Sequence, residues 1–144
     1  DELLAEFPGA DVLDVGTGTG VIALLAKKLG ARRVAGTDND GVALAAAKSG
    51  EALNGISGVE WMLCDDPSEV PGEFDIVVAN ILLNPLIELA PSLAAKVAPG
   101  GRLVLSGLLA AQADAAERAY AEQGLWPQAR KEREGWVRVE LSRP

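Results

Sequence analysis

Three glycines alternate with other residues directly after a short apolar run near the start of the chain, and residues 14–20 read DVGTGTG. Glycine at every second position lets the backbone turn sharply and approach a ligand closely, because no Cβ atom stands in the way. A dinucleotide-binding fingerprint, GxGxxG, would place its third glycine at position 21, where this chain has Val21. The spacing therefore predicts a ligand-binding loop of the GxGxG kind.

A carboxylate, Asp14, stands immediately before these glycines. It would repel the pyrophosphate of a dinucleotide and attract a ligand that carries an ammonium group. S-adenosylmethionine has an ammonium group, a carboxylate and a sulfonium on a nucleoside, so its amino-acid end suits an acid beside exposed loop amides. We therefore favour this methyl donor over a dinucleotide. A second interpretation, in which Asp14 only accepts hydrogen bonds from its own loop, stays open.

Two more carboxylates follow the next two apolar runs. Asp38 ends the second run, and in α/β nucleoside sites a carboxylate at this position accepts both ribose hydroxyls. It could instead cap the following helix, although Asp40 is better placed for that. Asp65 follows the third run, where it could accept the adenine amino group. Trp61 and Met62 either wall the base or belong to the core, which is the commoner role of an aromatic residue in a strand.

These side chains need a framework that brings the ends of several strands together. Apolar runs predict strands over 11–15, 33–38, 59–63, 74–79 and 102–106, and two further strands, 126–132 and 136–141, around a Glu134-Gly135 turn. Helical periodicity and capping residues predict helices over 19–30, 42–53, 85–97 and 110–123.

The alternation of strands and helices predicts an α/β fold. We expect a Rossmann-like, doubly wound and mainly parallel sheet of seven strands, with helices on both faces and an antiparallel C-terminal hairpin strand. In such a sheet ligands bind at the carboxyl ends of the strands. The glycine loop, Asp38 and Asp65 all fall at these ends.

Composition limits the range of functions. The 144 residues leave room for one domain, so we expect a single ligand-binding domain over 1–144. A formal net charge of -8 disfavours direct nucleic-acid or membrane binding, which needs clustered Lys and Arg. The first ten residues lack the basic start of a signal peptide. One cysteine, Cys64, and no histidine predict a reduced, cytoplasmic setting and no metal.

Four segments carry a resemblance to a known family. They are 11–20 (DVLDVGTGTG), 75–91 (DIVVANILLNPLIELAP), 99–107 (PGGRLVLSG) and 132–137 (EREGWV). On these segments the chain resembles the class I S-adenosylmethionine-dependent methyltransferases, and more closely the catalytic domain of the PrmA family, bacterial enzymes that methylate protein eleven of the large ribosomal subunit. Many methyltransferases share the first segment, whereas VANIL followed by PLIELAP is much more specific.

The resemblance implies a role for each matching residue. Asn80 would lie beside the reactive methyl as the catalytic residue, because its carbonyl can accept a hydrogen bond from a target amine and aim the lone pair of that amine. An Asn80 that only satisfies turn amides after its strand is the competing interpretation. The implied cofactor-binding residues are Asp14, Gly16, Thr17, Gly18 and Gly20 at the methionine end, Asp38 and Asn39 at the ribose, Asp65 at the adenine, and Asn80.

The resemblance also implies a function: an S-adenosylmethionine-dependent N-methyltransferase that releases S-adenosylhomocysteine. Its acceptor would be a protein amine, above all a lysine or the N-terminal amine of a large-subunit ribosomal protein. Family members carry an N-terminal recognition domain, whereas only about ten residues precede the first predicted strand here. Two alternatives stay open: a donor-binding module without efficient transfer, and a small-molecule methyltransferase. An apolar face left bare by the missing domain further predicts self-association.

Overall fold

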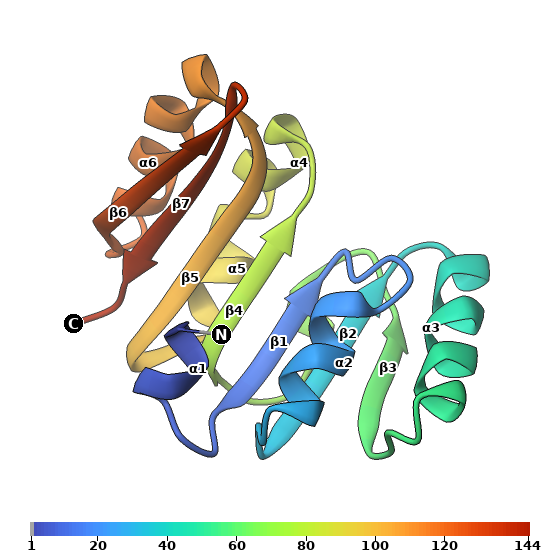
Figure 1. The fold of residues 1–144 in the computed structure, drawn as a ribbon. Helices are drawn as coiled ribbons and strands as arrows, with labels where there is room; N and C mark the ends of the chain where they lie inside the picture. The colour runs from blue at the N-terminus through green and yellow to red at the C-terminus, as the bar shows by residue number, and fades with distance from the viewer. Residues whose placement is uncertain (1) are drawn as a thin grey trace.

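The computed structural model describes residues 2–144, and within them seven strands form one sheet in the order β3-β2-β1-β4-β5-β7-β6 (Figure 1). The strands are β1 (Asp11–Val15), β2 (Arg33–Asp38), β3 (Val59–Leu63), β4 (Phe74–Asn80), β5 (Val97–Leu109), β6 (Trp126–Arg133) and β7 (Trp136–Ser142). Strands β1 to β5 are parallel, whereas β7 is antiparallel to both of its neighbours. The predicted doubly wound fold with an antiparallel C-terminal hairpin is confirmed.

Helices cover both faces of this sheet (Figure 1). One face carries α1 (Glu2–Glu6), α2 (Val21–Lys28) and α3 (Gly41–Leu53). The other face carries α4 (Leu83–Glu88), α5 (Ala90–Ala95) and α6 (Ala113–Ala121), with the short 3-10 helices η1 (Pro67–Glu69) and η2 (Ala110–Gln112). The larger apolar cluster lies under α4 to α6, where the buried Tyr120 hydroxyl donates a hydrogen bond to the Leu86 carbonyl at 2.6 Å.

Turn and capping residues set the ends of α2 and α3. Gly20 has a left-handed backbone (φ 83°), so α2 begins only at Val21, two residues later than predicted. Gly30, also left-handed (φ 99°), follows the last turn of α2, as expected for a residue that ends a helix. Asp40 caps α3 by accepting a hydrogen bond from the Val42 amide at 2.9 Å, which confirms that prediction.

The prediction of one helix over 85–97 is wrong, because the segment forms two helices that meet at Leu89. Proline at position 91 lacks an N–H group, and its ring would clash with the carbonyl of Ile87 in a continuous helix. The following segment, 99–101, does not end a helix either. It lies inside β5, which therefore extends well beyond the predicted range of 102–106.

The C-terminal hairpin follows its prediction closely. Glu134 and Gly135 both have positive φ, at 55° and 84°, which is the backbone of the tight turn that joins twisted antiparallel strands. Along β7, Val137, Val139 and Leu141 are buried and alternate with more exposed positions.

The predicted helix over 110–123 begins as η2 and continues as α6, ending at residue 121.

Helices α1 and α2 cover their face of the sheet only in part. Helix α2 buries two alanines, Ala23 and Ala26, and one larger side chain, Leu24. It leaves Ile22 and Leu25 exposed. A groove of about 330 Å³ lies there, lined mainly by apolar side chains of α1, α2, β4 and β5. This surface has the apolar character that the expected self-association requires, and the association itself stays a prediction. No helix within residues 2–144 is long and apolar enough to cross a membrane.

Candidate functional site

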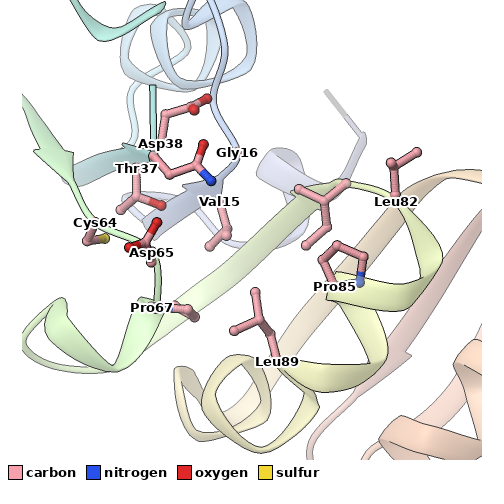
Figure 2. Close-up of a pocket in the computed structure, with 12 residues that line it drawn as sticks. Val15, Gly16, Thr37, Asp38, Cys64, Asp65, Pro67, Leu82, Pro85 and Leu89 are labelled. Carbon is pink, nitrogen blue, oxygen red and sulfur yellow. The ribbon is translucent and has the colours of Figure 1, made fainter. Parts of the chain in front are cut away.

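A pocket of about 340 Å³ lies at the carboxyl ends of β1 to β4 (Figure 2). Among the residues predicted to bind a ligand, Gly16, Asp38, Asn39 and Asp65 line it. The other lining residues are Val15, Thr37, Cys64, Pro67, Ile81, Leu82, Pro85 and Leu89. The pocket therefore brings together side chains from four separate segments of the chain.

Strand register explains this convergence. Val15 at the end of β1 pairs with Thr37 of β2 on one side and with Ala79 of β4 on the other, and Asp38 pairs with Leu63 of β3. The four strands therefore end at one level of the sheet. Strand β1 lies where the strand order reverses, which is the position at which open α/β sheets bind ligands.

The pocket has a polar side and an apolar side (Figure 2). Asp38 and Asp65 lie on the polar side, at the ends of β2 and β3. Pro85 and Leu89 of the α4 segment form the apolar side, which also includes Leu82. The sequence did not single out these apolar residues as site residues, although the place of Leu82 just after the end of β4 was a usable signal.

The loop from β1 to α2 takes a backbone that favours glycine. Gly16, Gly18 and Gly20 have φ values of 73°, 57° and 83°, all in the left-handed region. A Cβ atom at Gly16 would lie 2.6 Å from a side-chain carbon of Ile81, which leaves no room for any larger residue. The Thr17 amide donates a hydrogen bond to the Thr37 carbonyl at 2.8 Å and so ties the loop to β2.

Asp38 lines the pocket and also holds the glycine loop. Its Oδ2 atom accepts a hydrogen bond from the Gly18 amide at 2.9 Å, and its Oδ1 atom accepts one from the Asp40 amide at 3.0 Å. The predicted ribose contact stays a prediction. The contact with Gly18 adds a role that the spacing of the sequence did not reveal.

Asp14 and Thr17 lie beneath the loop rather than along the pocket wall. The Asp14 side chain is 1% exposed, and its Oδ2 atom accepts a hydrogen bond from the Thr17 hydroxyl at 2.8 Å. Its Oδ1 atom is buried and accepts no hydrogen bond from the described part of the chain. Burial raises the pKa of Asp14 to about 6, although the Thr17 hydrogen bond partly opposes this. Its predicted contact with a ligand's ammonium group stays a prediction.

Trp61 and Met62 do not line the pocket. Trp61 packs with the cluster under α2, and Met62 packs against the cluster on the opposite face. Both therefore belong to the core, which was the commoner of the two roles considered. Asp65, by contrast, is exposed at the pocket edge, as an acceptor for an amino group would need to be.

Asn80 ends β4, where it is exposed, and it lines neither this pocket nor a second one that includes Gly107. A Cβ atom at Gly107 would lie 2.6 Å from the Oδ1 atom of Asn80, so the amide packs directly against the end of β5. The second pocket, of about 320 Å³, shares Leu82 and Pro85 with the first. The rest of its lining is Leu83, Asn84, Gly107, Leu109, Gln112 and Trp136.

The side chains that line the pocket suit an organic ligand with hydroxyl and amino groups. Within residues 2–144 no cluster of three or more Asp, Glu, His and Cys side chains is arranged to hold a metal. The pocket offers two carboxylates on one side and apolar side chains on the other, which matches the hydroxyl groups and ring of a nucleoside.

Comparison with known proteins places this arrangement in a family context. The family model described as ribosomal protein L11 methyltransferase (PrmA) matches residues 3–144. A ribosomal protein L11 methyltransferase of Myxococcus xanthus is 48% identical over 143 residues, covering 99% of this chain and 49% of that protein. The chain spans about half the length of the curated relatives it matches.

Solved structures agree with the sequence matches. A crystal structure of a ribosomal protein L11 methylase from Lactobacillus delbrueckii subsp. bulgaricus superimposes with a TM-score of 0.91 at 34% identity, covering 96% of this chain and 72% of that one. Magnesium protoporphyrin IX methyltransferase from Synechocystis, solved with bound SAM, shares the fold with a TM-score of 0.77 at 22% identity, covering 99% and 75% of the two chains.

The buried Asp14 predicts a specific pH dependence of stability. In the unfolded chain the carboxyl titrates near 3.8 and in the folded chain near 6, so folding favours its protonated form. The stabilisation from this proton is complete at low pH and is lost as pH rises from about 4 to 6, by up to about 3 kcal/mol. Relative to the wild type, Asp14→Asn should therefore gain stability over this range, measured by urea unfolding.

The exposed carboxyl of Glu88 on α4 provides a matched control. Glu88→Gln should give a difference from the wild type that changes little between pH 4 and 7. A difference for Asp14→Asn that does not change with pH would contradict this prediction, because folding would then leave the pKa of the Asp14 carboxyl unchanged.

Proposed function

The chain belongs to the ribosomal protein L11 methyltransferase family, and from this premise we propose that it binds S-adenosylmethionine and methylates a protein amine. The acceptor would be a lysine or the N-terminal amine of a large-subunit ribosomal protein, in the cytoplasm, with S-adenosylhomocysteine as product. One observation carries the proposal: Gly16 of the glycine loop, Asp38 and Asp65 line one pocket at the strand ends.

The residues present fit the donor. Asp38 would accept the ribose hydroxyls with Asn39 beside it, and Asp65 would accept the adenine amino group. The apolar side of the pocket would contact the base. At the loop, Gly16 lines the pocket, and the unpartnered Asp14 Oδ1 atom beneath the loop would provide negative charge close to the methionine end.

In this proposal Asn80 would orient the acceptor. When bound, the donor supplies a methyl group that is already activated by its positive sulfur. The Asn80 Oδ1 atom would accept a hydrogen bond from the incoming neutral amine and aim its lone pair, so that catalysis consists mainly of positioning. Gly107 makes room for this amide, because any Cβ there would overlap Oδ1.

The second pocket is the natural approach for the acceptor. It meets the donor pocket at Leu82 and Pro85, so the two pockets are neighbours. Leu109 and Trp136 are large and partly exposed apolar residues along it, at 46% and 56% exposure. Such a lining suits the four methylene groups of a lysine side chain.

Calorimetric titration with S-adenosylhomocysteine tests the proposal directly, with NADH as the control ligand. We expect micromolar binding of the nucleoside and none of NADH, followed by methyl transfer to ribosomal protein L11 in a coupled assay. Nucleoside binding without transfer to any amine would instead support a binding module, and absence of nucleoside binding would contradict the proposal.

Asp38→Ala should weaken S-adenosylhomocysteine binding by about 10- to 100-fold. Hydrogen bonds to a charged acceptor contribute roughly 1.5–3 kcal/mol, and the substitution removes such an acceptor. Asp40→Ala is the matched control, because Asp40 carries the same charge two residues away but lies outside the pocket. A change of less than about twofold for Asp38→Ala, measured by calorimetry, would remove Asp38 from the binding site.

Asn80→Ala should reduce the turnover number on the order of 100-fold, because a misplaced acceptor loses its alignment with the methyl group. Affinity for S-adenosylhomocysteine should change little, since Asn80 does not line the donor pocket. Turnover is measured by methyl incorporation, with Asn54→Ala at the end of α3 as the control for a distant Asn substitution. Unchanged turnover would show that Asn80 only satisfies the turn after β4.

A further inference from the structure

The underside of the glycine loop rests on one large side chain, Trp61 of β3. A Cβ atom at Gly20 would lie 2.7 Å from the Cη2 atom of the indole, and one at Gly36 would lie 2.7 Å from its Cζ3 atom. Both distances are too short for any side chain larger than hydrogen. The indole therefore occupies the space that these two glycines leave open, between β2 and the end of the loop.

Strand register explains how a residue of β3 reaches a loop that follows β1. Asp14 pairs with Gly36, and Gly36 pairs with Trp61, so the three residues form one row across three strands. Side chains in such a row point to the same face of the sheet. Because Gly36 has no side chain, the indole can extend over β2 toward Asp14.

The same row brings the indole close to the loop's own hydrogen bonds. The Thr17 hydroxyl lies 3.0 Å from the Cβ position of Gly36, on which the indole also packs. This hydroxyl donates to Asp14 at 2.8 Å. The indole, the Thr17 hydroxyl and the Asp14 carboxylate therefore form a single packed layer beneath the loop.

Glu51 of α3 fixes the orientation of the indole. Its Oε1 atom accepts a hydrogen bond from the indole Nε1 atom at 3.2 Å, and its Oε2 atom accepts one from the Val59 amide at 2.9 Å. The Glu51 carboxylate therefore binds both the backbone of β3 and the Trp61 side chain. The indole is bound at one edge by α3 and contacts the loop with the opposite, six-membered ring.

We propose that Trp61 is a positioning residue for the methyl donor: it supports the glycine loop from below and sets the backbone against which the donor's methionine end lies. The inference rests on the proposed function, because Trp61 can position a methyl donor only if the loop binds one. Trp61 acts through the loop and does not line the donor pocket. A smaller side chain would leave a void under Gly20 and allow the loop to move.

Hydrogen exchange of the ligand-free chain tests the support, and calorimetry with S-adenosylhomocysteine tests its effect on binding. In Trp61→Leu, the amides of Gly18 and Gly20 should exchange about tenfold faster, while amides at the centres of β1 and β4 keep their rates. The dissociation constant for S-adenosylhomocysteine should rise about tenfold. Trp61→Phe keeps an aromatic ring and should show smaller effects of both kinds.

Val59→Ala is the matched control for simple loss of core packing. Val59 lies on the same strand, in the same apolar cluster and two residues from Trp61, but the contacts that support the loop are made by Trp61. It should destabilise the chain to urea without changing loop exchange or affinity. Equal acceleration of loop exchange in Val59→Ala would overturn the inference, because the effect would then be general.

Failure of this inference can be told apart from failure of the proposed function. If the wild-type chain binds S-adenosylhomocysteine and the Trp61 variants bind it equally well, Trp61 is not a positioning residue and the proposed function stands. If the wild-type chain does not bind it, the proposed function fails, and there is no bound donor for Trp61 to position. Unchanged loop exchange in Trp61→Leu overturns the inference whatever the binding result.

Discussion

The turn between β1 and α2 is the constraint on which the site depends. Its three glycines all have left-handed backbones, and Gly16 and Gly20 also have neighbours within 3 Å of any Cβ position. Such a turn makes few apolar contacts of its own, so its geometry must come from its surroundings. Asp38 holds it from the pocket side through the Gly18 amide, and Trp61 fills the space beneath it.

The hydrogen bond from Asp38 and the packing of Trp61 come from different parts of the sheet. Residues of one row, which includes Asp14, Gly36 and Trp61, point toward α2 and α3 and form the layer under the loop. Residues at the strand ends, such as Asp38 and Asp65, face the pocket. Ligand contacts and packing contacts therefore come from different residues of the same short segments, so a substitution can affect one without removing the other.

Local patterns in the sequence were enough to predict the fold, since apolar runs, glycine turns and the Asp40 cap are all read within a few residues. They failed where the outcome depended on distant partners. The burial of Asp14 and the reach of Trp61 follow from the register between strands, which no short segment encodes. The break at Leu89 is different, because Pro91 carried that information in the sequence itself.

The two oxygens of Asp38 link the pocket to both neighbouring elements. One holds the Gly18 amide of the loop, and the other holds the Asp40 amide at the start of α3. A carboxylate has about four lone-pair sites, so it can accept hydroxyl groups while keeping both amide contacts. A ligand bound there would therefore add to an existing network rather than replace it. Binding would then tighten the loop and the helix start together, because both depend on the same side chain.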